Sequence, residues 1–422
     1  MKIFISDLHL GCGDQLEDFV FWEKKALPVE KSLKFLSSGI NLMHEIFSDF
    51  IEEIIHKGGD GNPPLELIFL GDTFDLLQVL PEERKNPEKI HLIARSHQSF
   101  FESLRRFHDK GGDATFILGN HDHDLLHPEI WDVLIQHVPF ANQRYGGKPL
   151  LFYHDPEAGI YAEHGNQYDT LNAFKNPADP EEWPFGSELV LRLVNPLERS
   201  YPIIDNLGAQ ECLWYAIRHI PEVLSKTQRK DLLLTEALDT LSRENRLQHL
   251  AYFLLHQLMP TGGASVFQIL WRLLQMNEEL LRDSGTRKRP LKGLLYTFQC
   301  MGRNPLRIFQ EFLRDRLLEA AFKMARAKGK GGIGNPKPAP KFILLGHAHR
   351  PCAKRMQQGS LYINTGSWKM RAVPYRRLSF QLQQTLDYAL AFRTKQGRWH
   401  AQLFSWDEER RSPKEKNKAQ TC

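Results

Sequence analysis

The sequence predicts an α/β protein whose first strands are parallel, and two observations support this prediction. In the first third of the chain, short apolar segments alternate with longer segments in which apolar residues recur at helical spacing. Such a β-α-β-α-β order is typical of parallel strands joined by helices. In addition, a polar cluster directly follows each of the three apolar segments. Because sites in open α/β sheets gather beyond the carboxyl ends of the strands, a functional site is expected at that edge.

The expected elements of this first region have clear boundaries. A helix is predicted over 41–57, where apolar residues recur at every fourth position, as Leu42, Ile46, Phe50 and Ile54. Glycine and proline runs within 58–64 end this helix. A second helix is predicted over roughly 89–110, and the strands between these helices are expected at 2–6, 65–70 and 114–118.

The chain changes character after Asp169, and we expect a large, mainly helical insertion over 170–326. Its leucines recur on helical stripes, for example Leu247, Leu250, Leu254 and Leu258. Such stripes usually form the core of a helical unit. The alternative interpretation is that they line a groove that accepts lipid.

The remaining part of the chain is predicted to return to the first unit. A Gly/Pro-rich linker covers 327–340, and strands are expected at 341–345, 387–393 and 399–406. The catalytic core would therefore comprise 1–169 and 341–407. The polar, charged tail over 408–422 is predicted to be disordered.

The composition of the 422-residue chain fits a core with an added unit. Its hydrophobic content is 41% and its formal net charge is +4, so bulk charge does not predict a nucleic-acid binder. The five cysteines show no regular spacing, which argues against a disulfide framework or a structural zinc site and favours a reducing compartment.

The apolar stretches are all short. The one that follows Met1 leaves no room for a cleavable secretion signal, and none is long enough to cross a bilayer. We therefore expect a cytoplasmic protein without a transmembrane segment, for which peripheral contact with a membrane stays open.

Two polar clusters place pairs of possible metal ligands on one side of an extended chain. Asp7 and His9 are two residues apart after the first strand, and His347 and His349 repeat this spacing after a later one. Carboxylate and imidazole together can chelate one metal ion. A lone histidine is more often structural than a ligand, but a pair that follows an apolar strand and a glycine favours metal binding.

The second strand is followed by two further carboxylates. Asp72 comes directly after Gly71, and its two oxygens could bridge two cations. Asp75 could contact a metal ligand and orient it without binding the metal itself, or it could accept backbone N–H groups at the start of a helix. Both interpretations of Asp75 stay open.

The third strand is followed by Asn120, His121 and Asp122. Asn120 offers an oxygen to a metal ion or simply forms a turn, and His121 could reach a substrate. Asp122 could select the tautomer of the His121 imidazole. His164 follows another apolar stretch and adds one more candidate ligand.

In this order, the motifs Asp-x-His, Gly-Asp-x-x-Asp, Gly-Asn-His-Asp, His and Gly-x-His-x-His resemble those of the calcineurin-like metallophosphoesterase superfamily. The resemblance covers about 1–169 and 341–368, with no motif residue missing. It implies a four-layer α/β/β/α sandwich in which helices cover both outer faces of two packed sheets. It also implies two metal positions, one held by Asp7, His9, Asp72 and His349, and the other by Asp72, Asn120, His164 and His347.

This resemblance implies a hydrolase of phosphate esters or phosphoanhydrides that acts through a metal-bound hydroxide. The cofactors would be two divalent metal ions, with Mn expected and Zn or Fe as alternatives, because the ligands mix nitrogen and oxygen. His121, oriented by Asp122, would stabilise the transition state or protonate the leaving oxygen. The insertion would cap the metal edge, since its ends lie near His164 and His347 in the sequence.

The resemblance leaves the substrate open. The Asp-Leu-His-Leu opening and the His-Gly-Asn-Gln-Tyr-Asp run are similar to UDP-2,3-diacylglucosamine pyrophosphohydrolases, which implies a phosphorylated small-molecule or lipid-linked substrate. Unlike this chain with its His121, those enzymes typically carry Arg.

Two other functions compete with this interpretation. The Ser-Asp-Leu-His-Leu-Gly string also looks like that of double-strand-break repair exonucleases, and basic residues are dense from Arg282 to Lys330. They could meet nucleic-acid phosphates or form a solvated helical face. A non-catalytic interaction scaffold on the same fold is the alternative of another class.

Overall fold

The computed structural model gives a mixed α/β protein with two mixed sheets and a separate two-stranded sheet. The structure describes residues 1–14, 16–21, 33–58, 65–80, 83–169, 172–184, 316–326, 332–356, 359–375, 379–407 and 411–415, with isolated positions between 186 and 206. Most of the predicted insertion over 170–326 therefore lies outside the described residues. The α/β class expected from the sequence is confirmed.

The larger sheet has the strand order β13-β12-β11-β1-β2-β3. Its first three strands in the chain, β1 (Lys2–Ile5), β2 (Leu65–Leu70) and β3 (Gly112–Ile117), are parallel, as the alternating pattern predicts. The C-terminal part of the chain extends this sheet on the other side of β1 through antiparallel pairing. These strands are β11 (Asp387–Arg393), β12 (Trp399–Asp407) and β13 (Ser412–Glu415).

The second sheet has the order β4-β5-β6-β8-β7 and joins segments that are distant in the sequence. Its parallel strands are β5 (Ile160–Glu163), β6 (Phe342–Leu345) and β8 (Leu361–Asn364). Strands β4 (Tyr153–Asp155) and β7 (Cys352–Arg355) flank them in antiparallel pairing. The predicted return of the chain after the insertion is therefore a strand-to-strand contact, in which β6 pairs with β5. A separate pair is formed by β9 (Arg371–Tyr375) and β10 (Ser379–Gln383).

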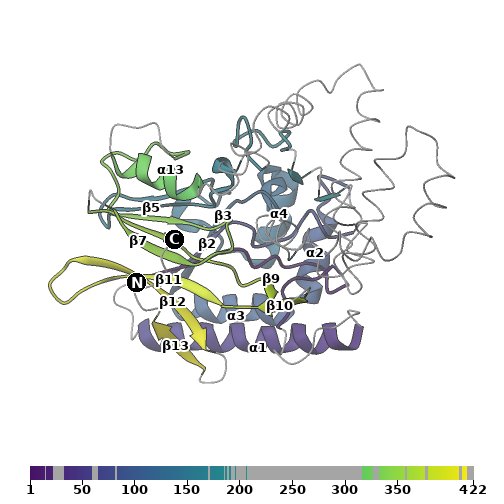
Figure 1. The fold of residues 1–422 in the computed structure, drawn as a ribbon. Coiled ribbons are helices and arrows are strands. Elements are labelled where there is room, and N and C mark those ends of the chain that lie inside the picture. Colours follow the sequence, from purple (N-terminus) through teal and green to yellow (C-terminus); the bar gives the residue numbers. More distant parts are fainter. Residues whose placement is uncertain are drawn as a thin grey trace, which may run out of the picture.

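Three apolar clusters hold helices and sheets together, and the strand alternation assigns residues to them. Ile3 and Ile5 of β1 belong to the cluster shared with the helices, whereas Phe4 belongs to the cluster shared with the second sheet. Both faces of β1 are therefore buried, which explains its continuous apolar sequence. The third cluster packs helix α13 (Arg316–Ala325) against β5 and β6. Figure 1 shows α13 and helix α1 (Leu33–Gly58) on opposite sides of the sheets.

The helices differ from the predicted ones at two points. Helix α1 already begins at Leu33, ahead of the expected start near residue 41. The single helix predicted over 89–110 consists of α2 (Glu88–Ser96) and α3 (Gln98–Asp109), which meet at His97. The backbone of His97 is not helical, at φ −121° and ψ 38°. Its buried ring lies between Glu17 and His44, at 3.0 and 2.9 Å, a contact that helical periodicity cannot reveal.

Short elements complete the described part of the chain. Helix α4 (Pro128–His137) follows the third strand and packs on the apolar cluster of α1. Three single-turn 3₁₀ helices lie in the connections, at His123–Leu126, Gln143–Tyr145 and Asn166–Tyr168.

The predicted linker and tail are more ordered than their composition suggests. In the linker, the backbone N–H groups of Ile333 and Gly334 donate to Glu163 and to the Tyr161 hydroxyl, at 3.0 and 2.9 Å. In the tail, residues 412–415 form β13, because the edge of β12 offers backbone partners to a chain that cannot form its own core. Disorder was therefore the wrong prediction for these four residues, and 416–422 lie outside the described part.

One cysteine also departs from the expected reduced state, because Cys352 is disulfide-bonded.

Among the described helices, none is both long enough and apolar enough to cross a membrane. The cytoplasmic location stays a prediction.

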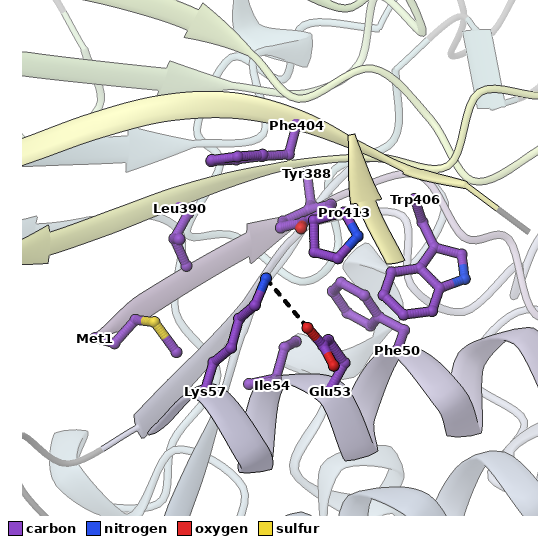
Figure 2. A pocket seen from close by; sticks show the side chains of 10 residues that line it. All are labelled: Met1, Phe50, Glu53, Ile54, Lys57, Tyr388, Leu390, Phe404, Trp406 and Pro413. Carbon is purple, nitrogen blue, oxygen red and sulfur yellow. Dashed lines mark ion pairs between the residues drawn. The ribbon is translucent and has the colours of Figure 1, made fainter. Parts of the chain in front are cut away.

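An apolar groove lies between α1 and the C-terminal strands (Figure 2). Phe50, Ile54, Tyr388 and Trp406 are among its lining residues, and the Lys57–Glu53 ion pair at 3.2 Å borders it. Met1, which precedes β1, also lines the groove, so the groove reaches the amino end of this strand, whereas Asp7 and His9 follow its carboxyl end.

A buried polar cluster around Glu66 ties the two sheets together. The Glu66 carboxylate accepts hydrogen bonds from Lys2, Tyr145, Thr115 and Tyr153, at 2.8 to 3.1 Å. Burial opposes ionisation of Glu66, but the Lys2 ammonium outweighs it and lowers the carboxyl pKa. The Glu66 carboxyl is therefore ionised in the folded protein.

We expect Glu66→Ala to lower the free energy of unfolding by about 3–5 kcal/mol, because the Tyr145, Thr115 and Tyr153 hydroxyls lose their acceptor. Lys2 would keep only the less buried Asp155, at 3.1 Å, among the carboxylates with which the described residues pair it. The exposed Glu102→Ala on α3 is the control and should change it by less than about 0.5 kcal/mol. Since the folded pKa of Glu66 is depressed, its contribution is complete above its unfolded pKa and is lost as the pH falls through the folded pKa. Urea unfolding at several pH values measures both effects; equal stability of the two variants would contradict the assignment.

Candidate metal centre

The predicted site residues meet at the carboxyl ends of five parallel strands. Asp7 and His9 follow β1, Asp72 follows β2, and Asn120 follows β3, all from the larger sheet. The second sheet contributes the loops after β5 and β6, which carry His164, His347 and His349. The backbone connects these loops directly, since Asp7 N–H donates to Gly71 at 3.2 Å and Gly346 N–H donates to His164 at 2.8 Å.

Two groups of these side chains have the spacing of metal ligands. Asp7, His9 and His349 form the first group, and Asp72, His164 and His347 form the second; within each, the candidate ligand atoms lie within 4.8 Å of one another. The two groups adjoin, because His9 Nε2 lies 3.9 Å from Asp72 Oδ2 and His164 Nε2 lies 4.0 Å from Asp7 Oδ1. We call the two groups the first and second metal positions.

The atoms that point into this cluster lack the partners that buried polar atoms normally have. Four of them have no hydrogen-bond partner among the described residues: Asp7 Oδ1, His9 Nε2, Asn120 Oδ1 and His164 Nε2. Two of them do have an ion-pair neighbour, since His164 Nε2 lies 3.0 Å from Asp72 Oδ2 and Asp7 Oδ1 lies 3.1 Å from His349 Nε2. Buried polar atoms are nearly always satisfied, and cations at the two metal positions would satisfy all four. These residues therefore fit a metal ion.

Asn120 joins this cluster through its oxygen, which distinguishes it from a plain turn residue. Its side chain is 4% exposed, and its Oδ1 is one of the four atoms just described. The neighbouring backbone supports the same geometry, because His121 N–H donates to Asp72 Oδ1 at 2.8 Å. The backbone on both sides of Asn120 thus adjoins the Asp72 carboxylate, at Gly119 and at His121.

Three glycines allow the loops to approach so closely. A Cβ on Gly119 would lie 2.1 Å from Asp72 Oδ1, and one on Gly71 would lie 2.6 Å from the His164 ring. A Cβ on Gly346 would lie 2.8 Å from Ser6 and 2.9 Å from Asp7 Oδ2. Any side chain at these positions would force the ligands apart, so the glycines in the three motifs serve the site directly.

The candidate ligands also have unusual backbone conformations. Asp7, His9, Asp72, His347 and His349 all have left-handed φ angles, between 51° and 64°. Residues other than glycine rarely adopt this region, and such strain concentrates at functional sites. These five residues lie in three of the five ligand-bearing loops, those after β1, β2 and β6.

Asp75 orients two histidines at once. Its Oδ2 lies 2.8 Å from His9 Nδ1, and its Oδ1 lies 2.9 Å from His121 Nδ1. The His9 ring therefore turns Nε2 toward the metal position. A carboxylate that contacts the other ring nitrogen of a metal-binding histidine normally orients the ring in this way. Asp75 Oδ1 also accepts the Gln78 N–H at 3.1 Å, but it does so in a turn over 76–78 and not at the start of a helix, as the second interpretation expected. His164 is held in a similar way, because its Nδ1 lies 2.7 Å from the Leu70 carbonyl oxygen.

The predicted role of Asp122 is wrong. Its carboxylate accepts the backbone N–H groups of Gly119 and Thr73, at 2.6 and 2.8 Å, and it is Asp75 that contacts the His121 ring. The physical reason is the tight turn over 119–122. Its Gly119 N–H points inward and donates to the Asp122 carboxylate of the same turn. Asp122 thus joins the loops after β2 and β3, while burial and then the charge of Asp72 raise its pKa to about 7.

The charges of the cluster compensate one another. Burial opposes ionisation of Asp7, but the imidazoles of His349 and His164 outweigh it and lower the Asp7 pKa to about 2. Burial likewise opposes protonation of His121, yet Asp75 and Asp72 outweigh it and raise the His121 pKa to about 9. Burial lowers the pKa of His9 to about 4, and the charges of Lys369 and His121 add to this effect. His9 is therefore neutral, as a metal ligand must be, and His121 carries a proton at neutral pH.

Asp169 is a neighbour of the site that the sequence analysis did not select. Its Oδ2 lies 3.1 Å from His347 Nε2 and accepts the Asn172 side-chain amide at 2.7 Å. The signal was present in the sequence, because Asp169 ends the run that begins with His164. Only the return of the chain through β6, however, brings His347 to it.

The segment over 172–184 packs beside the loops that follow β2 and β3. The Arg84 guanidinium lies 3.9 Å from the centre of the Trp183 ring and also donates to Asp124 at 3.1 Å. The His123 ring stacks on Phe174 with 3.9 Å between ring centres. These contacts place the start of the predicted insertion next to the turn that carries His121.

No protein-family model and no curated protein matches this chain.

Metal binding to this centre should release protons. Burial opposes protonation of His164, but Asp72 and Asp7 outweigh it and raise its pKa to about 10, so the metal-free ring is protonated at neutral pH. A metal ion must displace this proton, and its affinity should therefore rise as the pH rises from about 6 to 9. Calorimetric titration with Mn²⁺, in two buffers of different ionisation enthalpy, counts the released protons. An affinity independent of pH would contradict this assignment.

Proposed function

We propose that this protein is a dinuclear-metal hydrolase of phosphate esters or phosphoanhydrides. The observation that carries the proposal is the pair of adjoining metal positions, in which buried ligand atoms without partners face one another. Two neighbouring cations would activate a water nucleophile and neutralise the charge of a phosphoryl group, which is the chemistry that such hydrolysis requires. The mixed nitrogen and oxygen ligands favour Mn²⁺, with Zn and Fe as alternatives.

The proposal extends to the ligands and to the fold. We assign Asp7, His9, Asp72 and His349 to the first metal and Asp72, Asn120, His164 and His347 to the second. The order of the motifs and the three apolar clusters support a four-layer α/β/β/α arrangement of the calcineurin-like metallophosphoesterase type. The core would comprise 1–169 and 341–407, with the insertion over 170–326 as a cap.

His121 is the proposed proton donor to the leaving oxygen. Asp75 holds its Nδ1 at 2.9 Å, which leaves Nε2 to approach a substrate. The side chain is 15% exposed, the Asp75 side chain only 1%, so the ring lies at the boundary between buried site and solvent. Its raised pKa supplies the proton at neutral pH. Asp75 takes the orienting role that the sequence assigned to Asp122.

A phosphorylated small molecule or lipid-linked substrate is the proposed class, because the Asp-Leu-His-Leu and His-Gly-Asn-Gln-Tyr-Asp runs resemble those of the pyrophosphohydrolases named above. Most of the basic stretch from Arg282 to Lys330 lies outside the described residues. A nuclease remains a distinguishable outcome of the substrate screen, since its affinity for DNA should fall steeply with salt.

Asp72→Ala should abolish hydrolysis and reduce bound metal, because Asp72 serves both metal positions. We suggest reloading the protein with Mn²⁺ and screening p-nitrophenyl phosphate, its bis-ester, a UDP-linked pyrophosphate and single-stranded DNA. The exposed Asp132→Ala on α4 is the matched control and should retain activity and metal. A wild-type protein that binds no metal and turns over none of these compounds would instead support the non-catalytic scaffold.

His121→Ala should lower kcat by about 10²–10⁴-fold while bound metal stays at the wild-type level, because the ring is the proposed proton donor and belongs to neither of the two metal positions. The exposed His56→Ala on α1 serves as control. Asp75→Asn should give an intermediate loss of turnover, since His121 and His9 would keep a weaker partner. Turnover of His121→Ala within a few-fold of wild type would show that another group protonates the leaving oxygen.

A further inference from the structure

The backbone of Asp7 is held by the turn over residues 367–369. The Asp7 carbonyl oxygen accepts the N–H groups of Trp368 and Lys369, at 3.2 and 3.1 Å, and the Ser367 hydroxyl at 3.0 Å. Asp7 has a left-handed φ of 55°, which a non-glycine residue keeps only when its surroundings impose it. The position of the Asp7 carboxylate therefore depends on where this turn lies.

The turn is anchored by a buried ion pair. Lys369 Nζ lies 2.6 Å from Asp18 Oδ2, and the two side chains are 4% and 2% exposed. Asp18 belongs to the loop that continues from His9, so the pair clamps this loop to the turn. A buried ion pair is stable only when further hydrogen bonds satisfy its remaining atoms. The contacts around Asp18 therefore decide whether the clamp holds.

One of these contacts comes from a residue far along the chain. Asn206 donates from Nδ2 to Asp18 Oδ1 at 3.2 Å, across 188 sequence positions, and its side chain is buried. Asn206 falls within the predicted insertion and is one of its few described residues. The chain of contacts thus runs from Asn206 through Asp18 and Lys369 to the carbonyl oxygen of Asp7.

A second asparagine from the same region makes a different contact. Asn195 is also buried and donates from Nδ2 to the Leu77 carbonyl oxygen at 2.8 Å. Leu77 lies in the loop after β2, and this hydrogen bond involves neither Asp18 nor Lys369. Asn195 therefore provides a matched comparison, because the same side chain is buried at the same edge without reaching the ion pair.

We propose that Asn206 is a positioning residue for the first metal position, and that it acts through the Asp18–Lys369 ion pair on Asp7. Removal of its amide takes one donor from a buried carboxylate, and the ion pair is expected to shift as the remaining contacts of Asp18 rearrange. Since Lys369 N–H donates to Asp7, that shift moves the turn and loosens a metal ligand. The inference rests on the proposed metal centre and adds that a contact from residue 206 tunes its affinity.

The test measures metal affinity without any substrate. Asn206→Ala should weaken Mn²⁺ binding at one of the two positions by about tenfold, which is the usual effect of removing a residue that orients a metal ligand. Asn195→Ala should change the Mn²⁺ affinity by less than about threefold. Calorimetric titration of full-length protein gives both values, and circular dichroism with urea unfolding verifies that each variant is folded. In an Asp18→Asn background, Asn206→Ala should have no further effect, because the shared pathway is already broken.

The possible outcomes separate this inference from the proposed function. If wild type binds two metal ions and hydrolyses a phosphate compound while Asn206→Ala binds Mn²⁺ within twofold of it, the inference fails and the function stands. Equal losses in the two asparagine variants, or additive losses with Asp18→Asn, would also overturn it, because the effect would then not pass through the ion pair. A wild-type protein without metal affinity would overturn both.

Discussion

Four aspartate carboxylates are buried together at one edge of the protein, and the arrangement around them follows from the need to compensate their charge. Asp7, Asp72, Asp75 and Asp122 are each at most 1% exposed. An ionised carboxylate is stable in such a place only with charged or hydrogen-bonding partners. Imidazoles surround Asp7, Asp72 and Asp75, and backbone N–H groups hold Asp122. The compensation is incomplete at the centre, where candidate ligand atoms without hydrogen-bond partners among the described residues converge, and a cation there would complete it.

This concentration of charge requires loops that approach more closely than side chains usually permit. The glycines next to Asp72, Asn120 and His347 remove the Cβ atoms that would collide there. Left-handed backbone at the ligands turns their side chains inward over very short loops. Such conformations cost free energy, and the apolar clusters on both faces of the larger sheet supply the rigid platform that sustains them.

The edge is further supported by residues that lie far from the motifs. His97 interrupts two helices and contacts Glu17, whose carboxylate also accepts the N–H groups of Gly11 and Gly13 in the loop after His9. Asn206 reaches the same edge from the predicted insertion through its hydrogen bond to Asp18. Ligand geometry is thus set by the surrounding contacts as much as by the motif residues, which is typical of metal sites.

The sequence alone determined the α/β class, the parallel order of the first three strands and the residues of the centre, because strand alternation, helical periodicity and ligand spacing are local patterns. It did not determine which carboxylate contacts His121, why a helix ends at His97, or that residues 412–415 form a strand. Each of these depends on a partner distant in the sequence: Asp75, Glu17 and β12 respectively. The tertiary structure decided them, because long-range hydrogen bonds and sheet edges leave no periodic trace in the chain that forms them.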